Sequence, residues 1–308
     1  MRILVLGAGA IGGYYGGRLA ESGADVTFLV RPLRAQLLAE RGLVVRSPLG
    51  DIERGVKTAL AGELREPFDL VLLSCKAYDL ASAIEAITPA MGPQSVVLPL
   101  LNGINHMAVL TQRFGAARVL GGACGIGVTL NPSGEVVHAA PMEWLTLGEL
   151  AGERSARCET ITKALAAAKV NASISDDIIQ AMWEKFVMLA SLATATTLTR
   201  ANIGEVMAAP TGEWLMLESF AECERVASAE GRPPSPAAVE RIRKMLTTKG
   251  STFTASMMRD LVAGGATEGE HIIGDLVRRA EKHGLTAPVL RVALANLQVH
   301  EGRRAKSA

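Results

Sequence analysis

Short apolar runs separated by amphipathic or polar segments fill the first half of the chain, and only helical patterns follow. Each run has the length and composition of a strand buried in a parallel sheet. The runs are residues 3–6, 25–30, 68–74 and 96–100. Amphipathic segments follow the first two runs, and this alternation predicts an α/β fold with an N-terminal doubly wound sheet.

Other segments of the N-terminal half carry turn signals. Residues 43–46 and 52–58 are joined through a Pro-Leu-Gly-Asp turn and predict a pair of strands. Residues 119–147 alternate apolar runs with turn signals at 131–134 and 140–141. This pattern predicts an antiparallel extension that closes the first domain.

A helix at residues 155–168 and a strand at 170–174 complete the α/β part of the chain. Ser175 then caps a helix with two aspartates in its first turn, where carboxylates favour the helix dipole. The later periodic segments are all helical, at residues 178–197, 212–229, 236–246, 269–283 and 288–299. We therefore predict two domains, residues 1–176 and an all-α domain of residues 177–308.

Composition excludes two classes of partner. The formal net charge is +1, so the chain has no basic excess for binding nucleic acid or an anionic membrane. The four cysteines are scattered without C-x-x-C spacing, which favours reduced thiols. The N-terminus lacks a signal-peptide pattern, and the apolar stretch 186–198 is too short to span a bilayer. We expect a soluble, cytoplasmic protein.

The first strand leads directly into Gly7, Gly9 and Gly12, which have G-x-G-x-x-G spacing. These glycines suit a tight turn, backbone approach to a pyrophosphate, and close contact between helix and strand. Ala10 and Ile11 open the helix, whose free N–H groups point at the phosphates. The pattern predicts a Rossmann-type dinucleotide site, and a glycine-rich turn without a ligand is the alternative.

The end of the second strand indicates which dinucleotide is bound. Where NAD-binding folds carry an Asp or Glu for the ribose, this chain has Arg31, with Arg34 one helical turn later. A guanidinium suits the 2′-phosphate of NADPH, so we expect NADPH/NADP+ as the cofactor. The alternative is that both arginines are ordinary surface charges.

Two more polar residues follow strands of the same sheet. Lys76 comes after the run 68–74, and Asn102 comes after the run 96–100. The carboxyl ends of parallel strands are where ligands collect in this architecture, so both side chains are candidates for the site. Taken singly, a solvated lysine and a turn-forming asparagine would explain them better. Their shared placement at this edge favours a functional role.

In the second domain, Lys185 lies within a helix that is apolar on two faces. Such a lysine needs a counter-charge or a catalytic role, because loss of water favours its neutral form and makes it a proton donor near neutral pH. The alternative is a buried stem with the ammonium in water. Glu184 is expected to point elsewhere, into solvent.

Together these motifs resemble the ketopantoate reductase (2-dehydropantoate 2-reductase) family over residues 1 to about 300. The resemblance rests on the glycine loop, on Lys76 in SCKAYD, on Asn102 in LLNGIN, on Trp183-Glu184-Lys185, and on the later SMMRD and Thr267-Glu268 segments. It implies a Rossmann domain, an all-helical second domain, and a cleft holding NADPH and a 2-oxo acid. It further implies an enzyme of pantothenate biosynthesis.

The resemblance also implies roles for single residues. Lys185 matches the lysine that donates a proton to the ketone oxygen, and Glu268 the carboxylate that binds the substrate hydroxyl and helps hold the lysine. Asn102 matches an asparagine beside nicotinamide and substrate, Lys76 a lysine near the cofactor, and Ser256 the serine that binds the substrate carboxylate. No metal is implied, and Glu268, Glu270 and His271 fall short of a metal site.

One departure from the family concerns the substrate pocket. The family has asparagines one and two turns after the catalytic lysine, where this chain has Leu189 and Ala193. The change removes hydrogen bonds to a hydroxylated substrate and suggests a more apolar 2-oxo acid. A protein that binds NADPH as a sensor or scaffold without turnover is the alternative.

The polar, glycine-rich residues 247–266 suit either a lid or a connector. The apolar helices of the second domain are candidates for a homodimer surface.

Overall fold

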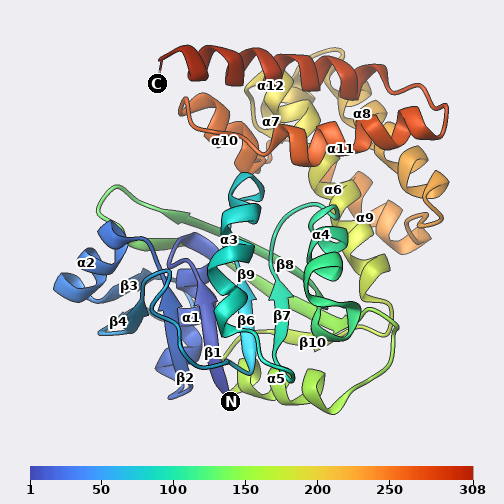
Figure 1. Ribbon diagram of the computed structural model, residues 1–308. Helices are drawn as coiled ribbons and strands as arrows, with labels where there is room; N and C mark the ends of the chain where they lie inside the picture. The colour runs from blue at the N-terminus through green and yellow to red at the C-terminus, as the bar shows by residue number, and fades with distance from the viewer. Residues whose placement is uncertain (308) are drawn as a thin grey trace. The chain divides into compact units, whose positions relative to one another are not determined.

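The computed structural model describes residues 1–307, and its elements are drawn in Figure 1. The chain forms two compact units. Unit 1 contains residues 1–102 and 106–181, and unit 2 contains residues 103–105 together with the chain from Met182 onward.

The first sheet of unit 1 is parallel, with strand order β5-β2-β1-β6-β7. Its strands are β1 (Arg2–Leu6), β2 (Asp25–Leu29), β5 (Lys57–Ala59), β6 (Leu70–Leu73) and β7 (Val96–Pro99). All four residues of β6 and of β7 are buried, as expected for strands covered on both faces. The helices that follow these strands are α1 (Ala10–Glu21), α2 (Pro32–Arg41), α3 (Leu80–Ile87) and α4 (His106–Phe114). The predicted doubly wound α/β sheet is therefore confirmed.

A second sheet contains β3 (Leu43–Arg46), β4 (Ile52–Arg54), β8 (Leu120–Leu130), β9 (Val136–Glu149) and β10 (Ala172–Ile174). The helix α5 (Ala156–Ala167) precedes β10. The antiparallel β8–β9 pair confirms the predicted extension and its turn at 131–134.

Two predictions about these strands are wrong. Residues 52–58 are not one strand, because β4 pairs with β3 in the second sheet whereas β5 pairs with β2 in the first. Residues 140–141 are not a turn, because β9 continues through them. The β8–β9 register shifts between Ile126 and Val128, and Pro141 lies opposite this irregularity, where a missing N–H breaks no ladder bond.

Helix α1 is packed between the two sheets, and its glycines make this possible. A Cβ at Gly16 would come within 2.6 Å of the Phe28 ring of β2, and one at Gly17 within 3.0 Å of Leu43 in β3. Both glycines are buried, and the apolar side chains around them form a continuous core. The fold thus holds the N-terminus of α1 rigidly at the end of β1.

In the described part of unit 2 every regular element is helical, as predicted. The elements are α6 (Ile178–Thr199), which begins at the end of unit 1, α7 (Ile203–Ala208), α8 (Gly212–Ala229), α9 (Pro236–Leu246), α10 (Ser256–Val262), α11 (Gly269–Lys282) and α12 (Pro288–Ser307). Helix α12 is longer than predicted. The helices α3, α4 and α7 were not predicted.

Candidate active site

The three glycines of the loop after β1 have different structural reasons. Gly7 has φ +87°, and its N–H donates to the Leu29 carbonyl oxygen at 2.9 Å. A Cβ at Gly12 would overlap the Gly7 carbonyl oxygen and the Ser74 hydroxyl, so the helix touches the turn there. A Cβ at Gly9 would meet no atom within 4 Å. The space above Gly9 is therefore open, as a passing pyrophosphate requires.

The N-terminus of α1 suits an anion. Gly9 is the N-cap residue and supplies no side-chain cap, and the first turn of α1 contains no acidic residue. The first-turn N–H groups, including those of Ala10 and Ile11, therefore have no partner within their own helix, and no carboxylate in that turn opposes a phosphate. These residues fit the pyrophosphate of a dinucleotide.

The sheet brings four predicted residues to one edge. Because β1, β2, β6 and β7 are parallel and adjacent, Gly7, Arg31, Lys76 and Asn102 all follow their carboxyl ends at the same edge. The guanidinium of Arg31 bonds the carboxylate of Asp79 at 2.9 Å, which joins the segments after β2 and β6. This ion pair gave no signal in the sequence.

Arg31 and Arg34 differ in environment. The Arg31 side chain is 78% exposed. Arg34 is partly buried, donating from Nε to the Ala8 carbonyl oxygen at 3.0 Å and from Nη1 to the Gly134 carbonyl oxygen at 2.7 Å. Burial lowers the pKa of Arg34 below its ordinary value. Arg34 thus ties the glycine loop to the β8–β9 turn, whereas Arg31 is the arginine open to a ligand.

Lys185 lies on α6 in unit 2 and is partly buried. Its neighbours Trp183 and Phe186 are buried and pack with their ring centroids 5.6 Å apart. Lys185 forms no hydrogen bond or ion pair with any of residues 1–307. Its three donors are therefore available to a ligand.

The expectation that Glu184 points into solvent is wrong. Its side chain is 17% exposed, accepts the Ser235 N–H at 3.0 Å and lies 3.5 Å from Arg241. Since Ser235 is the N-cap of α9, Glu184 stabilises the start of that helix. It gives Lys185 no ion pair.

Other predicted site residues lie at helix starts in unit 2. Glu268 is the N-cap of α11, is 6% exposed, and makes no side-chain capping bond to its own helix. Ser256 is the first residue of α10 and is partly buried. Asn102 directly precedes Gly103, where a Cβ would lie 3.1 Å from the His271 ring of α11. This contact joins Gly103 to α11 within unit 2.

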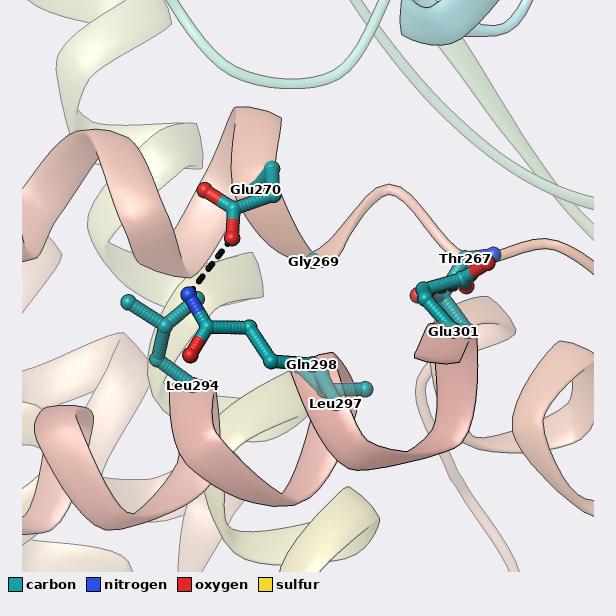
Figure 2. A pocket seen from close by; sticks show the side chains of 7 residues that line it. All are labelled: Thr267, Gly269, Glu270, Leu294, Leu297, Gln298 and Glu301. Atoms are coloured by element: carbon teal, nitrogen blue, oxygen red, sulfur yellow. Dashed lines mark hydrogen bonds between the residues drawn. The ribbon is translucent and has the colours of Figure 1, made fainter. Parts of the chain in front are cut away.

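A pocket of about 170 Å³ adjoins the start of α11 (Figure 2). Its lining residues are Thr267, Gly269, Glu270, Leu294, Leu297, Gln298 and Glu301. Its carboxylates bond protein groups: Glu270 accepts from the Gln298 amide at 2.7 Å, and Glu301 accepts from Thr267. Two of its lining residues, Thr267 and Gly269, flank Glu268 in the chain, and the sequence analysis did not predict this pocket.

Three further observations concern metal ligands, cysteines and membrane-spanning helices. Within residues 1–307, no group of three or more His, Cys, Asp or Glu side chains is placed to hold a metal ion. None of the four cysteines forms a disulfide within these residues. Over the same residues, none of the helices combines the length and the apolar character that crossing a membrane requires.

Comparison with known proteins assigns the family. Residues 3–152 match the family model described as ketopantoate reductase PanE/ApbA, and residues 177–301 match its C-terminal counterpart. An uncharacterized oxidoreductase of Bacillus subtilis, YkpB, is 38% identical over 99% of this chain and 100% of its own length. This chain belongs to the ketopantoate reductase family. It is therefore an oxidoreductase by family, and a nicotinamide dinucleotide is its cofactor.

Other members and neighbours of the ketopantoate reductase family agree in fold. The 2-dehydropantoate 2-reductase of Halobacterium salinarum is 33% identical over 96% of this chain and 97% of that protein. The crystal structure of 2-dehydropantoate 2-reductase from Geobacter metallireducens has a TM-score of 0.88 at 28% identity, covering 97% of this chain and 99% of that one. D-mandelate dehydrogenase, solved with NADH and anilino(oxo)acetate, shares the fold at TM-score 0.90 and 23% identity over 99% of this chain and 100% of that one.

Proposed function

We propose that this protein reduces a 2-oxo acid with NADPH, and that Lys185 donates the proton. The observation that carries the proposal is the environment of Lys185: the residue is partly buried on α6 beside the buried Trp183 and Phe186, and it has no bonding partner among the described residues. Its ammonium is therefore available to pair with negative charge on a ligand. A ketone oxygen that gains negative charge is a suitable ligand.

In the proposed mechanism, bound NADPH supplies hydride chemistry, and the side chains act on the substrate. The Lys185 ammonium lies at the ketone oxygen, where it stabilises charge that develops in the transition state and then gives up a proton. Glu268 binds a polar group of the substrate, Ser256 binds the carboxylate of the acid, and Asn102 orients the reacting carbonyl. Lys76 assists at the cofactor.

The choice of NADPH rests on Arg31, which is exposed and whose guanidinium is paired with the carboxylate of Asp79. An exposed ion pair such as that with Asp79 is worth about 0–1 kcal/mol, so a 2′-phosphate can displace the carboxylate. Arg31→Asp should lower the ratio of NADPH affinity to NADH affinity by at least about 10-fold. An unchanged ratio would remove Arg31 from the cofactor site.

The substrate is 2-dehydropantoate or a more apolar 2-oxo acid. Leu189 is partly buried and Ala193 is buried on the helix that carries Lys185, and neither offers a hydrogen bond to a substrate hydroxyl. Support for an apolar acid comes from these two residues. The anilino(oxo)acetate bound to D-mandelate dehydrogenase is a ligand of that protein and does not identify the substrate of this chain. Turnover of 2-dehydropantoate would make the protein an enzyme of pantothenate biosynthesis.

The test measures NADPH oxidation, through the loss of NADPH absorbance, with a panel of 2-oxo acids that do or do not carry a hydroxyl group. We expect one acid to be reduced, and Lys185→Ala to lower kcat by at least about 100-fold without changing NADPH affinity. Lys249→Ala removes an exposed lysine of the same unit and serves as the matched control. NADPH binding without oxidation by any acid would refute the reductase and support a sensor or scaffold.

A further inference from the structure

Helix α12 holds the segment that leads into Glu268. The ring nitrogen Nε2 of His300 lies 2.8 Å from the Gly265 carbonyl oxygen. One carboxylate oxygen of Glu301 accepts both the N–H and the hydroxyl of Thr267, at 2.7 and 2.8 Å. Figure 2 shows the Glu301 and Thr267 side chains together at the end of the pocket. Two consecutive residues of α12, His300 and Glu301, thus bond Gly265 and Thr267, which precede Glu268 in the chain.

The Glu301 carboxylate is suited to this task. Burial alone would raise the pKa of Glu301, but the hydrogen bonds from Thr267 and the contact with Arg304 lower it below its ordinary value. The group is therefore anionic at neutral pH, and its bonds to Thr267 are charge-assisted. Thr267 is 8% exposed, so little water competes for its donors.

The residue after Glu268 is fixed as well. A Cβ at Gly269 would come within 2.9 Å of Leu297, so α11 begins in close contact with α12. The Glu268 carbonyl oxygen accepts the Ile272 N–H at 3.0 Å, which ties its backbone into α11. Glu268 is therefore held on both sides, by Thr267 before it and by Gly269 after it. Its side chain makes no capping bond that would turn it back onto its own helix.

We propose that Glu301 is a positioning residue, which directs the Glu268 carboxylate toward the substrate by anchoring Thr267. The inference rests on the proposed function, in which Glu268 binds a polar group of the 2-oxo acid. Glu301 itself touches no substrate. Its effect passes through the Thr267 peptide, because a displacement of about 1 Å at a binding group is enough to reduce catalysis strongly.

The test is a double-mutant cycle on kcat/KM with the 2-oxo acid found in the panel. Glu301→Ala should lower kcat/KM by about 10-fold, the loss expected when two hydrogen bonds that order a binding group are removed. In a Glu268→Ala background the same substitution should change kcat/KM by less than about 2-fold, since no carboxylate remains to be positioned. NADPH affinity should stay at the wild-type value in every variant.

Two variants separate positioning from general loss of structure. Thr267→Val keeps the shape and the N–H but removes the hydroxyl, and should lower kcat/KM by about 3-fold, again only when Glu268 is present. It decides the case if Glu301→Ala fails to fold. Glu270→Gln alters the neighbouring carboxylate of the same pocket, which does not bond Thr267, and should leave kcat/KM unchanged.

The outcomes are distinguishable. An equal effect of Glu301→Ala with and without Glu268 would overturn the positioning role, as would wild-type kcat/KM in Glu301→Ala and Thr267→Val. If Glu268→Ala itself leaves kcat/KM unchanged, the assignment of Glu268 in the proposed function fails first. If Glu268→Ala lowers kcat/KM but Glu301→Ala and Thr267→Val do not, only the inference about Glu301 fails.

Discussion

Gly9 and Gly12 offer a paired test of the cofactor site, because an added methyl group meets opposite surroundings at the two positions. At Gly9 it meets no protein atom within 4 Å, and φ is −80°, which alanine adopts freely. At Gly12 it overlaps the Gly7 carbonyl oxygen and the Ser74 hydroxyl. One substitution therefore fills open space, and the other fills space already occupied by protein.

The expected magnitudes follow from these contacts. Gly9→Ala should leave the free energy of unfolding within about 0.5 kcal/mol of wild type, as for a substitution that touches nothing. It should weaken NADPH binding by about 1.5–3 kcal/mol, the value of one hydrogen bond to a charged phosphate, so the Kd for NADPH should rise about 10- to 150-fold. Gly12→Ala should cost about 1–3 kcal/mol through overpacking, and the apparent Tm should fall by several degrees.

Two measurements separate the effects. Thermal unfolding without ligand reports the protein's own stability, and titration with NADPH followed by nicotinamide fluorescence reports Kd. If Gly9→Ala binds NADPH with wild-type affinity, no pyrophosphate passes over Gly9. If Gly12→Ala unfolds at the wild-type temperature, the close contact between α1 and the Gly7 turn does not constrain the fold.

Two further predictions concern stability. Burial alone would raise the pKa of Glu149, but hydrogen bonds from Arg157 and Ser155 lower it; a depressed carboxylate stabilises the folded state above its unfolded pKa of about 4.3, and this contribution disappears as the pH falls through the folded value. Glu149→Gln should therefore lower the unfolding free energy by about 2 kcal/mol at pH 7, and chemical denaturation should find this difference shrinking below pH 4.3; a constant difference contradicts the argument. Phe186 on α6 is fully buried, so Phe186→Ala should lower the free energy of unfolding, measured with denaturant, by about 3–5 kcal/mol. A decrease of less than about 1 kcal/mol would mean that the helix is poorly packed.

Local patterns were sufficient for most elements and for the placement of the site candidates along the chain. The strand, the glycines and the start of α1 follow from adjacent residues, as does the position of Lys185 on an apolar helix. The helices α3, α4 and α7 were missed because each is short. The Asn202–Glu205 capping box of α7 was a signal in the sequence that the prediction did not use. The roles of Lys185, Glu268 and Ser256 remain predictions, since they depend on a bound substrate.

The main strands and long helices, the glycine loop and the change to helices after residue 176 were determined by the sequence alone, because spacing and turn chemistry act over a few residues. Only the tertiary structure decided that residues 52–58 divide between two sheets, that Arg34 bonds the Ala8 carbonyl oxygen, and that Glu301 anchors Thr267. The physical reason is that these contacts join segments far apart along the chain. Such pairings depend on which surfaces pack together, and no local periodicity records that choice.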